Sequence, residues 1–354
     1  MKDRKQKVYV GMSGGVDSSV AAALLVEQNY EVTGVFIKVW EPPNFSCTWR
    51  DDRRDAMRVA AQLSIPFITL DLSAEYKQGV VDYMIAEYQA GRTPNPDVMC
   101  NKTVKFGAFF NWARNEGVDY VATGHYAQII SKGNQFELHA GLDPTKDQSY
   151  FLWSLAQTHL AHTLFPVGHY PKKEVRALAE KFQLPTATKK DSQGLCFIGK
   201  LNVKDFLKNF IEAKPGEVIT ESGEVVGRHD GVFFYTLGER HGFTVTQKTT
   251  AEKPYYIVAK DLDRNRLIVA TDPKSEEMVT KTARLTNTNW NTSPPASNKT
   301  YQVQLRYHGE CLPVTLASTA DGYVVSFVEP VLATPGQSLV VYEGSQCLGG
   351  GIII

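Results

Sequence analysis

The chain has 354 residues, of which 43% are hydrophobic, 21% charged and 11% aromatic. These values are typical of globular proteins and exclude a disordered chain, and the length suits two or three domains rather than one. Lys and Arg together number 38, as do Asp and Glu, so there is no net charge to attract nucleic acid. Any RNA must therefore be held by local contacts.

The N-terminal segment 1–11 carries positive charges but has no apolar stretch of the kind found in signal peptides. The longest obvious apolar run, Val20–Val26, has seven residues, far short of the roughly 20 needed to cross a bilayer. We therefore expect a cytoplasmic protein with no membrane contact. The five cysteines are Cys47, Cys100, Cys196, Cys311 and Cys347. Their wide spacing, with no C-x-x-C pair, predicts neither a disulfide framework nor a structural zinc site.

Strand-like and helix-like segments alternate through residues 1–200. The predicted strands are Lys7–Met12, Glu31–Trp40, Phe67–Leu70 and Val118–Thr123. The predicted helices are Ser18–Gln28, Arg53–Leu63, Asp82–Gln89, Phe106–Asn115 and Pro171–Phe182. Gly91–Cys100 and Leu184–Gly199 are expected to be loops, the first because of its glycine and prolines. Such alternation predicts a parallel sheet covered by helices on both faces.

From Lys214 the composition becomes turn-rich, with the short alternating runs of a small β-dominated module. The pattern is β again from about Met278 to the end. The predicted strands there are Tyr301–Arg306, Leu312–Leu316, Tyr323–Val328 and Ser338–Val341. Several short strands separated by turns predict a barrel. Residues 276–354 hold four basic and six acidic residues, a net charge of −2, so this barrel is not a basic clamp.

The strongest local signal is the segment Ser13–Ser19 (SGGVDSS), between a predicted strand and a predicted helix. Its two glycines allow a tight turn whose N–H groups face an anion, and the following helix adds the positive end of its dipole. It is not a Walker A loop, because no lysine follows the glycines. The alternative is an ordinary strand–helix turn capped by Asp17 or Ser18. The strand–loop–helix context favours a phosphate site.

SGGVDS resembles the PP-loop of the ATP pyrophosphatases. That family cleaves ATP between its α and β phosphates and uses the adenylate to activate a carbonyl oxygen. It includes amide- and amidine-forming synthetases as well as RNA thiolases, so the motif implies ATP and AMP chemistry and leaves the substrate open.

Two cysteines lie in segments that suit a reactive thiol. If the helix predicted at Phe106–Asn115 extends back to Cys100, this thiol lies near a helix N-terminus with a lysine nearby, and both features favour the thiolate. Asp97, three residues earlier, could serve as a general acid or base. Cys196 lies in a glycine-flanked segment that follows two lysines. A structural role remains the alternative for each cysteine.

Seven segments occur in the order and spacing of one family: GMSGGVDSSVAAALL, FIKVW, GRTPNPDVMCNKTVKFG, ATGHYA, KDQSYFLW, DSQGLCFIG and CLGGGIII. Residues 7–354 closely resemble the bacterial tRNA-specific 2-thiouridylases, the MnmA family. The expected fold class is therefore α/β, with a Rossmann-like PP-loop domain and its parallel sheet at residues 1–200. A small central β-rich domain is expected at 201–275, and a C-terminal β-barrel that contacts tRNA at 276–354.

The resemblance also implies roles for individual residues. Those that would hold ATP are Gly11, Met12, Ser13, Gly14, Gly15, Val16, Asp17, Ser18, Ile37 and Gly124. Those that would contact the target uridine are Asn95, Pro96 and Asp97. Other tRNA contacts would be His125, Lys146, Asp147, Gln148, Arg306, Tyr307 and Gln337. Cys196 would carry a persulfide, and Cys100 would be the nucleophile that resolves the sulfur transfer. Ile37 replaces a methionine found in many members, which leaves the shape of the adenine pocket open.

The function implied is ATP-dependent 2-thiolation of the wobble uridine of tRNA, through adenylation of the C2 oxygen and release of AMP and pyrophosphate. ATP and Mg²⁺ are the expected cofactors, with no metal ligands assigned. The expected partners are the anticodon loops of the Lys, Glu and Gln tRNAs and a persulfide donor such as a cysteine desulfurase or a sulfur-relay protein. Sulfur could be delivered by direct persulfide attack or as released hydrosulfide. The rival interpretations are an amide- or amidine-forming PP-loop synthetase, which would not need Cys100 and Cys196, and a non-catalytic RNA-binding module.

Overall fold

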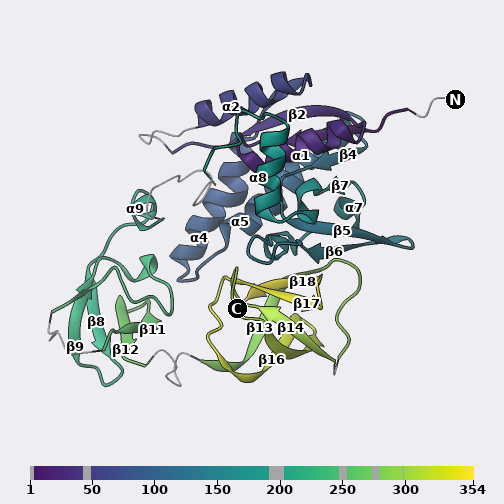
Figure 1. Cartoon of the computed structure of the whole chain (residues 1–354). Helices are drawn as coiled ribbons and strands as arrows, with labels where there is room; N and C mark the ends of the chain where they lie inside the picture. Colours follow the sequence, from purple (N-terminus) through teal and green to yellow (C-terminus); the bar gives the residue numbers. More distant parts are fainter. Residues whose placement is uncertain (1–3, 43–48, 191–202, 247–252, 273–278, 298) are drawn as a thin grey trace.

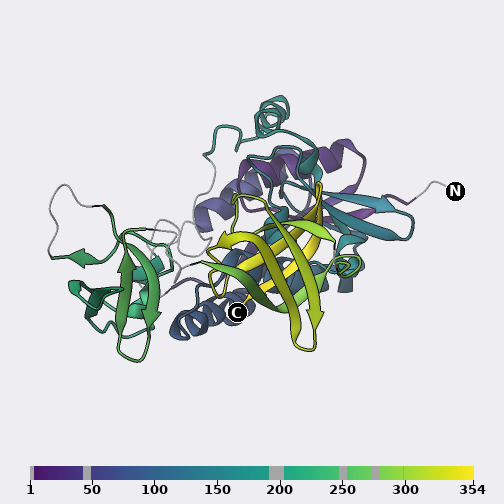
Figure 2. The same ribbon diagram turned by 90° about the horizontal axis from the view of Figure 1, so that it is seen from below.

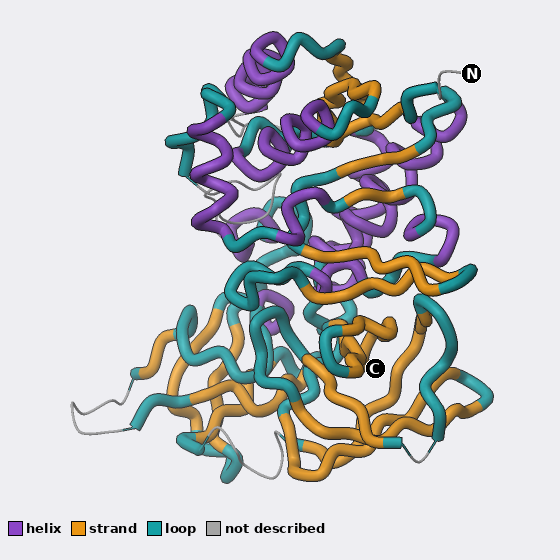
Figure 3. The backbone as a smooth tube through the Cα atoms, turned by 45° about the vertical axis from the view of Figure 1, so that its right-hand side comes forward, coloured by secondary structure: helices purple, strands orange, loops and turns teal. Residues whose placement is uncertain are grey.

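The structure is a computed structural model that describes residues 4–42, 49–190, 203–246, 253–272, 279–297 and 299–354. The described strands form a parallel sheet in the N-terminal part, a five-stranded sheet in the central part and a larger sheet that closes into a barrel (Figure 1). Seen from below, the central sheet stands to one side of the barrel (Figure 2). Helices gather at the end of the molecule opposite the central and C-terminal strands (Figure 3).

The N-terminal sheet has five parallel strands in the order β3-β2-β1-β4-β7. They are β1 (Lys7–Gly11), β2 (Glu31–Lys38), β3 (Phe67–Asp71), β4 (Tyr120–Ala122) and β7 (Thr163–Leu164). The chain first builds outward from β1 to β3 and then crosses to the other side of β1 with β4. Doubly wound sheets bind ligands where the strand order reverses in this way, beyond the carboxyl ends of the strands. The predicted parallel sheet is confirmed.

Helices cover both faces of this sheet. The main α-helices are α1 (Val16–Glu27), α2 (Trp49–Gln62), α4 (Tyr83–Gln89), α6 (Phe110–Asn115) and α8 (Lys172–Lys181). The other helical segments of the described chain are α3 (Ser73–Tyr76), α5 (Pro96–Met99), α7 (Gln157–Leu160), α9 (Val203–Leu207), π-helical η1 (Lys77–Asp82) and η2 (Cys100–Phe109), and the 3₁₀ turns η3 (Ser149–Leu152), η4 (Pro166–His169) and η5 (Val232–Phe234), the last of these in the central part. Side chains alternate across a strand, so Val8 and Val10 enter the core under α1 while Tyr9 packs on the opposite core with Phe109.

The prediction of a loop at Gly91–Cys100 is wrong from Pro96 onward, where the chain is helical. The Oδ1 atom of Asn95 accepts a hydrogen bond of 3.2 Å from the amide of Val98, which caps a helix that begins at Pro96. Through η2 and α6 this helix continues to Asn115. Asparagine at the N-cap and proline at the first helical position mark a helix start. Cys100 thus lies in the second turn and is only 6% exposed.

The central part is a five-stranded sheet in the order β10-β9-β8-β12-β11. Its strands are β8 (Gly216–Thr220), β9 (Val225–His229), β10 (Thr244–Val245), β11 (Tyr256–Asp261) and β12 (Arg266–Ala270). All neighbours are antiparallel except β8 and β12. The predicted central β-rich domain is confirmed. Within the described ranges, the helices are all too short or too polar to cross a bilayer.

Six C-terminal strands form the predicted barrel, which closes where β13 pairs with β18. They are β13 (Thr280–Trp290), β14 (Thr300–Gln304), β15 (Leu312–Thr319), β16 (Gly322–Val331), β17 (Ser338–Glu343) and β18 (Gln346–Ile353). The sequence did not predict a hairpin of β5 (Ala127–Lys132) and β6 (Gln135–Ala140). Cys347 of β18 pairs with Leu138 of β6, so this hairpin extends the barrel sheet and ties it to the N-terminal part.

Candidate functional site

The SGGVDS loop joins the end of β1 to the start of α1. The hydroxyl of Ser18 accepts a hydrogen bond of 3.2 Å from the amide of Ser13, and the hydroxyl of Ser19 donates to the carbonyl of Gly15 at 2.7 Å. Gly14 has a φ of +75°, and a Cβ there would lie 2.2 Å from the carbonyl oxygen of Asp52 in α2. A Cβ on Gly15 would meet only the Ser13 hydroxyl, at 3.4 Å. The loop therefore packs closely against α2 at Gly14 and is open at Gly15, where phosphate groups could bind.

Asp17 fixes this loop to two other parts of the chain. Its Oδ1 atom accepts a hydrogen bond of 2.7 Å from the hydroxyl of Tyr126. The ammonium of Lys172, at the start of α8, lies 2.7 Å from Oδ1 and 2.9 Å from Oδ2. Sequence reasoning missed both partners. Tyr126 lies in the ATGHYA segment, but no role was predicted for it. No sequence pattern points to Lys172, which lies 155 residues from Asp17.

The end of β4 connects the loop to the Cys100 helix. A Cβ on Gly124 would lie 2.6 Å from the amide nitrogen of Ser18, so this residue contacts the loop backbone directly. The next residue, His125, has Nδ1 2.7 Å from Thr123 Oγ1 and Nε2 3.3 Å from the ammonium of Lys105. Burial, and then the charge of Lys105, lower the pKa of His125 well below its usual value. Although proposed as an RNA contact, His125 is 8% exposed and both ring nitrogens have partners within the protein.

Asp97 and Cys100 begin the helix that packs against this end of β4. Burial raises the pKa of the Asp97 carboxyl above its ordinary value, and the charge of Lys105 partly opposes that rise. Cys100 is buried in the second turn of this helix. Cys196 lies outside the described residues, as does Cys47. The ammonium of Lys189, one of the two lysines that precede Cys196 in the sequence, lies 2.7 Å from the carboxylate of Asp52 and 2.8 Å from that of Asp55 in α2.

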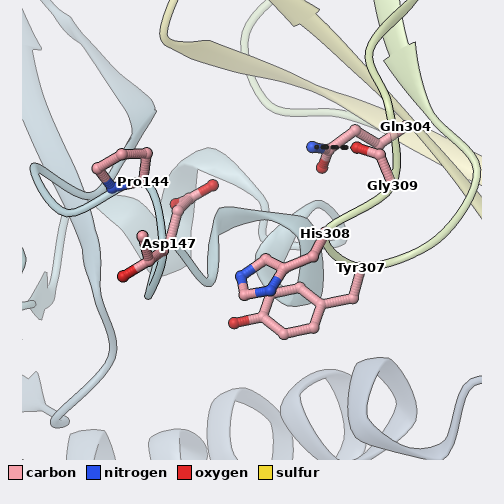
Figure 4. A pocket seen from close by; sticks show the side chains of 7 residues that line it. Pro144, Asp147, Gln304, Tyr307, His308 and Gly309 are labelled. Atoms are coloured by element: carbon pink, nitrogen blue, oxygen red, sulfur yellow. Dashed lines mark hydrogen bonds between the residues drawn. The ribbon is translucent and has the colours of Figure 1, made fainter.

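A pocket lies where the loop around Asp147 meets the barrel (Figure 4). This pocket has a volume of about 350 Å³ and is lined by Pro144, Thr145, Asp147, Gln304, Tyr307, His308 and Gly309. The rings of Tyr307 and His308 stack with centroids 3.9 Å apart, and Phe151 supports Tyr307 at 4.4 Å. Burial raises the pKa of Tyr307 to about 12, so its phenol is neutral. The structure thus brings Asp147 and Tyr307 to one pocket, and Arg306 beside Tyr307 is exposed.

Hydrogen bonds hold the neighbouring loops in place. Asp147 accepts bonds from the amides of Gly141 and Ser149, at 2.9 and 3.0 Å. Gln148 accepts one of 3.0 Å from the amide of Tyr126. On the barrel side, the amide group of Gln337 donates to the carbonyls of Thr93 and Pro94, at 2.8 and 3.2 Å. The barrel therefore orients the chain that leads into Asn95.

Metal coordination finds little support in the residues that the structure describes. They contain no group of three or more His, Cys, Asp or Glu side chains arranged to hold a metal. Both carboxylate oxygens of Asp17 are engaged by Lys172 and Tyr126. The side chains of Met12 and Val16 are buried, and Ile37 is half-buried on β2. The phosphate loop thus offers mainly backbone and hydroxyl groups to a nucleotide.

Comparison with known proteins covers nearly the whole chain. Residues 6–200 match the family model of the tRNA methyl transferase HUP domain, 204–271 that of the tRNA methyl transferase PRC-barrel domain, and 280–353 that of the aminomethyltransferase beta-barrel domain. The tRNA-specific 2-thiouridylase MnmA of Pseudomonas fluorescens Pf-5 is 45% identical over 355 residues, covering 99% of this chain and 94% of that protein. The enzyme of the same name from Enterococcus faecalis V583 is 45% identical over 356 residues, covering 99% and 95%.

The parallel sheet, the SGGVDS cradle and the reversal of strand order at β1 and β4 define a PP-loop protein of the ATP pyrophosphatase class, which uses ATP. Relatives that are 45% identical over 94% or more of their length also identify the family within this class. The chain belongs to the tRNA-specific 2-thiouridylase (MnmA) family.

Proposed function

We propose that the chain is an ATP-dependent tRNA sulfurtransferase that replaces the C2 oxygen of the wobble uridine with sulfur. Membership of the 2-thiouridylase family supports the reaction and the tRNA substrate. The observation that links the proposal to particular residues is a pair of contacts just after β4. Gly124 contacts the phosphate loop there, and His125 contacts Lys105 on the helix of Asp97 and Cys100. ATP held by the loop and a base held at that helix would therefore be neighbours.

The first step would activate the uracil carbonyl, whose oxygen is a poor leaving group. The C2 oxygen attacks the α phosphorus of ATP, pyrophosphate leaves, and the uracil N3 proton passes to the carboxylate of Asp97. Ser13–Ser18 would hold the β and γ phosphates through backbone amides and the α1 dipole. Their predicted neighbours in the ATP site are Gly11, Met12, Ile37 and Gly124. Mg²⁺ would arrive on the phosphates of ATP and neutralise part of their charge.

The second step would deliver sulfur. The terminal sulfur of a Cys196 persulfide attacks C2, and AMP leaves with the former C2 oxygen. The thiolate of Cys100 then attacks the Cys196 sulfur, which breaks the S–S bond and leaves sulfur on C2. N3 regains its proton from Asp97, and the resulting Cys100–Cys196 disulfide must be reduced by a thiol before the next turnover. In the alternative route, Cys100 first releases hydrosulfide, which then attacks C2.

The tRNA would dock through its anticodon loop, whose unpaired bases can be splayed at little cost. Asn95, Pro96 and Asp97 would contact the uridine. Surrounding contacts would come from His125, Lys146, Asp147, Gln148, Arg306, Tyr307 and Gln337. The Lys, Glu and Gln tRNAs are the proposed substrates, and a cysteine desulfurase or a sulfur-relay protein is the proposed donor. We assign the catalytic, central and barrel domains to residues 1–200, 201–275 and 276–354.

Incubation of the protein with tRNA, ATP and a persulfide donor tests the proposal, with mass analysis of the tRNA nucleosides as readout. We expect sulfur in place of oxygen at the wobble uridine, and no product with Cys100→Ser. Addition of a methyl group, which the names of two matching family models suggest, would contradict the proposal. So would ATP consumption with no change in the nucleosides, as an amide-forming synthetase would show. Binding of tRNA with neither event would indicate an RNA-binding module.

A further inference from the structure

Segment 91–95 joins α4 to the helix that begins at Pro96. The chain leaves α4 between the central sheet and the barrel (Figure 1 and Figure 2). Gly91 has a φ of +75°, and a Cβ there would lie 2.6 Å from Cδ1 of Leu262, in the turn between β11 and β12. The segment therefore begins in direct contact with the central part of the molecule.

Thr93 uses its amide, its carbonyl and its hydroxyl in contacts with the two other parts of the chain. The amide donates a hydrogen bond of 2.9 Å to the carbonyl of Pro335, and the carbonyl accepts one of 2.8 Å from Nε2 of Gln337. The hydroxyl donates one of 3.1 Å to the hydroxyl of Thr236, in the central part. Thr93 is 8% exposed, so water competes little with these bonds. The N-terminal, central and barrel parts thus meet at this one residue.

The barrel side of this junction is tightly packed. Gly336 has a φ of +91°, and a Cβ there would lie 2.8 Å from the carbonyl oxygen of Thr93. A glycine allows the two backbones to approach this closely. The amide of Gly336 in turn donates a hydrogen bond of 2.9 Å to the carbonyl of Ile353 in β18. The barrel therefore presents a fixed backbone surface to Thr93.

Two prolines stiffen the short stretch that leads from Thr93 into the helix. Pro94 and Pro96 have a fixed φ, and each keeps the residue before it extended. Asn95 is extended, with a φ of −111° and a ψ of 95°. Nε2 of Gln337 also lies 3.2 Å from the carbonyl of Pro94, so the peptide group that leads into Asn95 is itself held. A displacement of Thr93 would therefore move Asn95 with it.

We propose that Thr93 is a positioning residue of the thiolation site: bound to the central part and to the barrel, it fixes Asn95 and Asp97 where the target uridine is received. The inference rests on the uridine contacts proposed above for this helix start. Thr93 touches no reacting atom. Its bonds to the barrel use backbone atoms, so the contribution of its side chain is the bond to Thr236. The central part thereby gains a role in the reaction, as the second fixed point of the uridine site.

The first test does not depend on turnover. Thr93→Val removes the hydroxyl, keeps the size of the side chain nearly unchanged and leaves the backbone bonds in place. We expect the amide of Val98, which the side chain of Asn95 caps, to exchange with deuterium about fivefold faster, the scale of one lost hydrogen bond. Amides within α1 should keep their wild-type rates. Hydrogen exchange with residue-level mass spectrometry measures both.

Thr300→Val, at an exposed threonine of β14, is the matched control and should change neither rate. Unchanged exchange at Val98 in Thr93→Val would overturn the inference. An equal acceleration of the α1 amides would also overturn it, because the hydroxyl would then support only the general stability of the fold. If Thr93→Val does not fold, Thr236→Val breaks the same bond from the other side, and the same outcomes decide.

The second test is a double-mutant cycle on single-turnover thiolation at saturating ATP and tRNA. Thr93→Val and Thr236→Val should each lower the rate about fivefold, and the double variant should lose no more than either, because all three lack the same bond. The dissociation constant for ATP should stay at its wild-type value. Losses that add up, or a wild-type rate in both single variants, would contradict the proposal. Absence of thiolated uridine from the wild-type protein would instead defeat the proposed function, and the exchange of the Val98 amide would still decide the role of Thr93.

Discussion

The ammonium of Lys172 lies 2.7 and 2.9 Å from the two carboxylate oxygens of Asp17, although 155 residues separate the two in the chain. The Lys172 side chain is 12% exposed and that of Asp17 30%. With the Tyr126 hydroxyl as a further donor, this ion pair joins the phosphate loop to α8. Residues distant in the sequence therefore stabilise the conformation of the loop.

Asp17→Ala should lower AMP formation and thiouridine formation together, because the loop loses the carboxylate that binds Lys172 and Tyr126. We expect a loss of stability on the order of 1–3 kcal/mol, since the half-buried hydrogen bonds that Asp17 accepts are lost. Nucleotide and nucleoside analysis, with thermal unfolding, measures both effects. Asp51→Ala, which removes an exposed pair with Arg54 on α2, is the control. Loss of thiouridine with AMP formation unchanged would refute this role for Asp17.

Gly14→Ala should abolish ATP binding. The new Cβ would meet the carbonyl of Asp52 at 2.2 Å, and the φ of +75° is itself unfavourable for alanine. Gly117→Ala is a matched control, because its φ is +74° and nothing lies within 4 Å of the added Cβ. The control should cost only the backbone strain, about 1–2 kcal/mol, and bind ATP as the wild type does. Equal ATP affinity in both variants, by equilibrium dialysis, would argue against the cradle.

Much of this site could be predicted from local sequence. The strand, the two glycines and the following helix are contiguous in the chain, so the phosphate loop follows from residues 7–28 alone. Asn95-Pro96 shows the limit of such reasoning. Asn-Pro is common both in loops and at the start of helices. In the structure the side chain of Asn95 accepts a hydrogen bond from the amide of Val98, which stabilises the helix start. The β5–β6 hairpin also had a signal, two alternating runs separated by Gly133-Asn134, that the prediction did not use.

Long-range partners could not be predicted in this way. Lys189 and Lys190 in sequence suggest a positive environment for Cys196, whereas Lys189 is paired with Asp52 and Asp55. The pairing of β6 with β18 is equally remote in sequence. It joins the barrel and the N-terminal part through one apolar cluster that includes Phe106, Leu138 and Val340. Deletion of residues 276–354 would uncover that cluster, so single substitutions are the better test of the barrel.

Tyr307→Ala should weaken tRNA binding about tenfold, the loss of one stacking contact. The slope of affinity against salt concentration should stay unchanged, because the phenol is neutral. Arg306→Ala should instead reduce that slope by about one phosphate contact. Both are measured by tRNA binding across a salt series, with Lys299→Ala, an exposed lysine paired with Glu343, as control. Full affinity in both variants would remove Arg306 and Tyr307 from the tRNA surface.

The cysteines should separate into two groups. Cys100→Ser and Cys196→Ser should each abolish thiolation, whereas Cys47→Ala, Cys311→Ala and Cys347→Ala should leave the chemistry intact. Cys347 is fully buried, and burial raises the pKa of its thiol far above the ordinary value. It should therefore resist alkylation in the folded protein, and Cys347→Ala should cost about 1 kcal/mol of stability. Thiolation by Cys196→Ser from a persulfide donor without free sulfide would exclude the persulfide role.

The nucleotide products test the central claim most directly. With α-³²P-labelled ATP, tRNA and a persulfide donor, the label should appear in AMP, and AMP and thiouridine should form in equal amounts. The loop would hold the β and γ phosphates as one unit, so the bond must break at the α phosphorus. AMP should not form at that rate when tRNA is left out. Label in ADP, or the same rate of AMP formation without tRNA, would contradict the account.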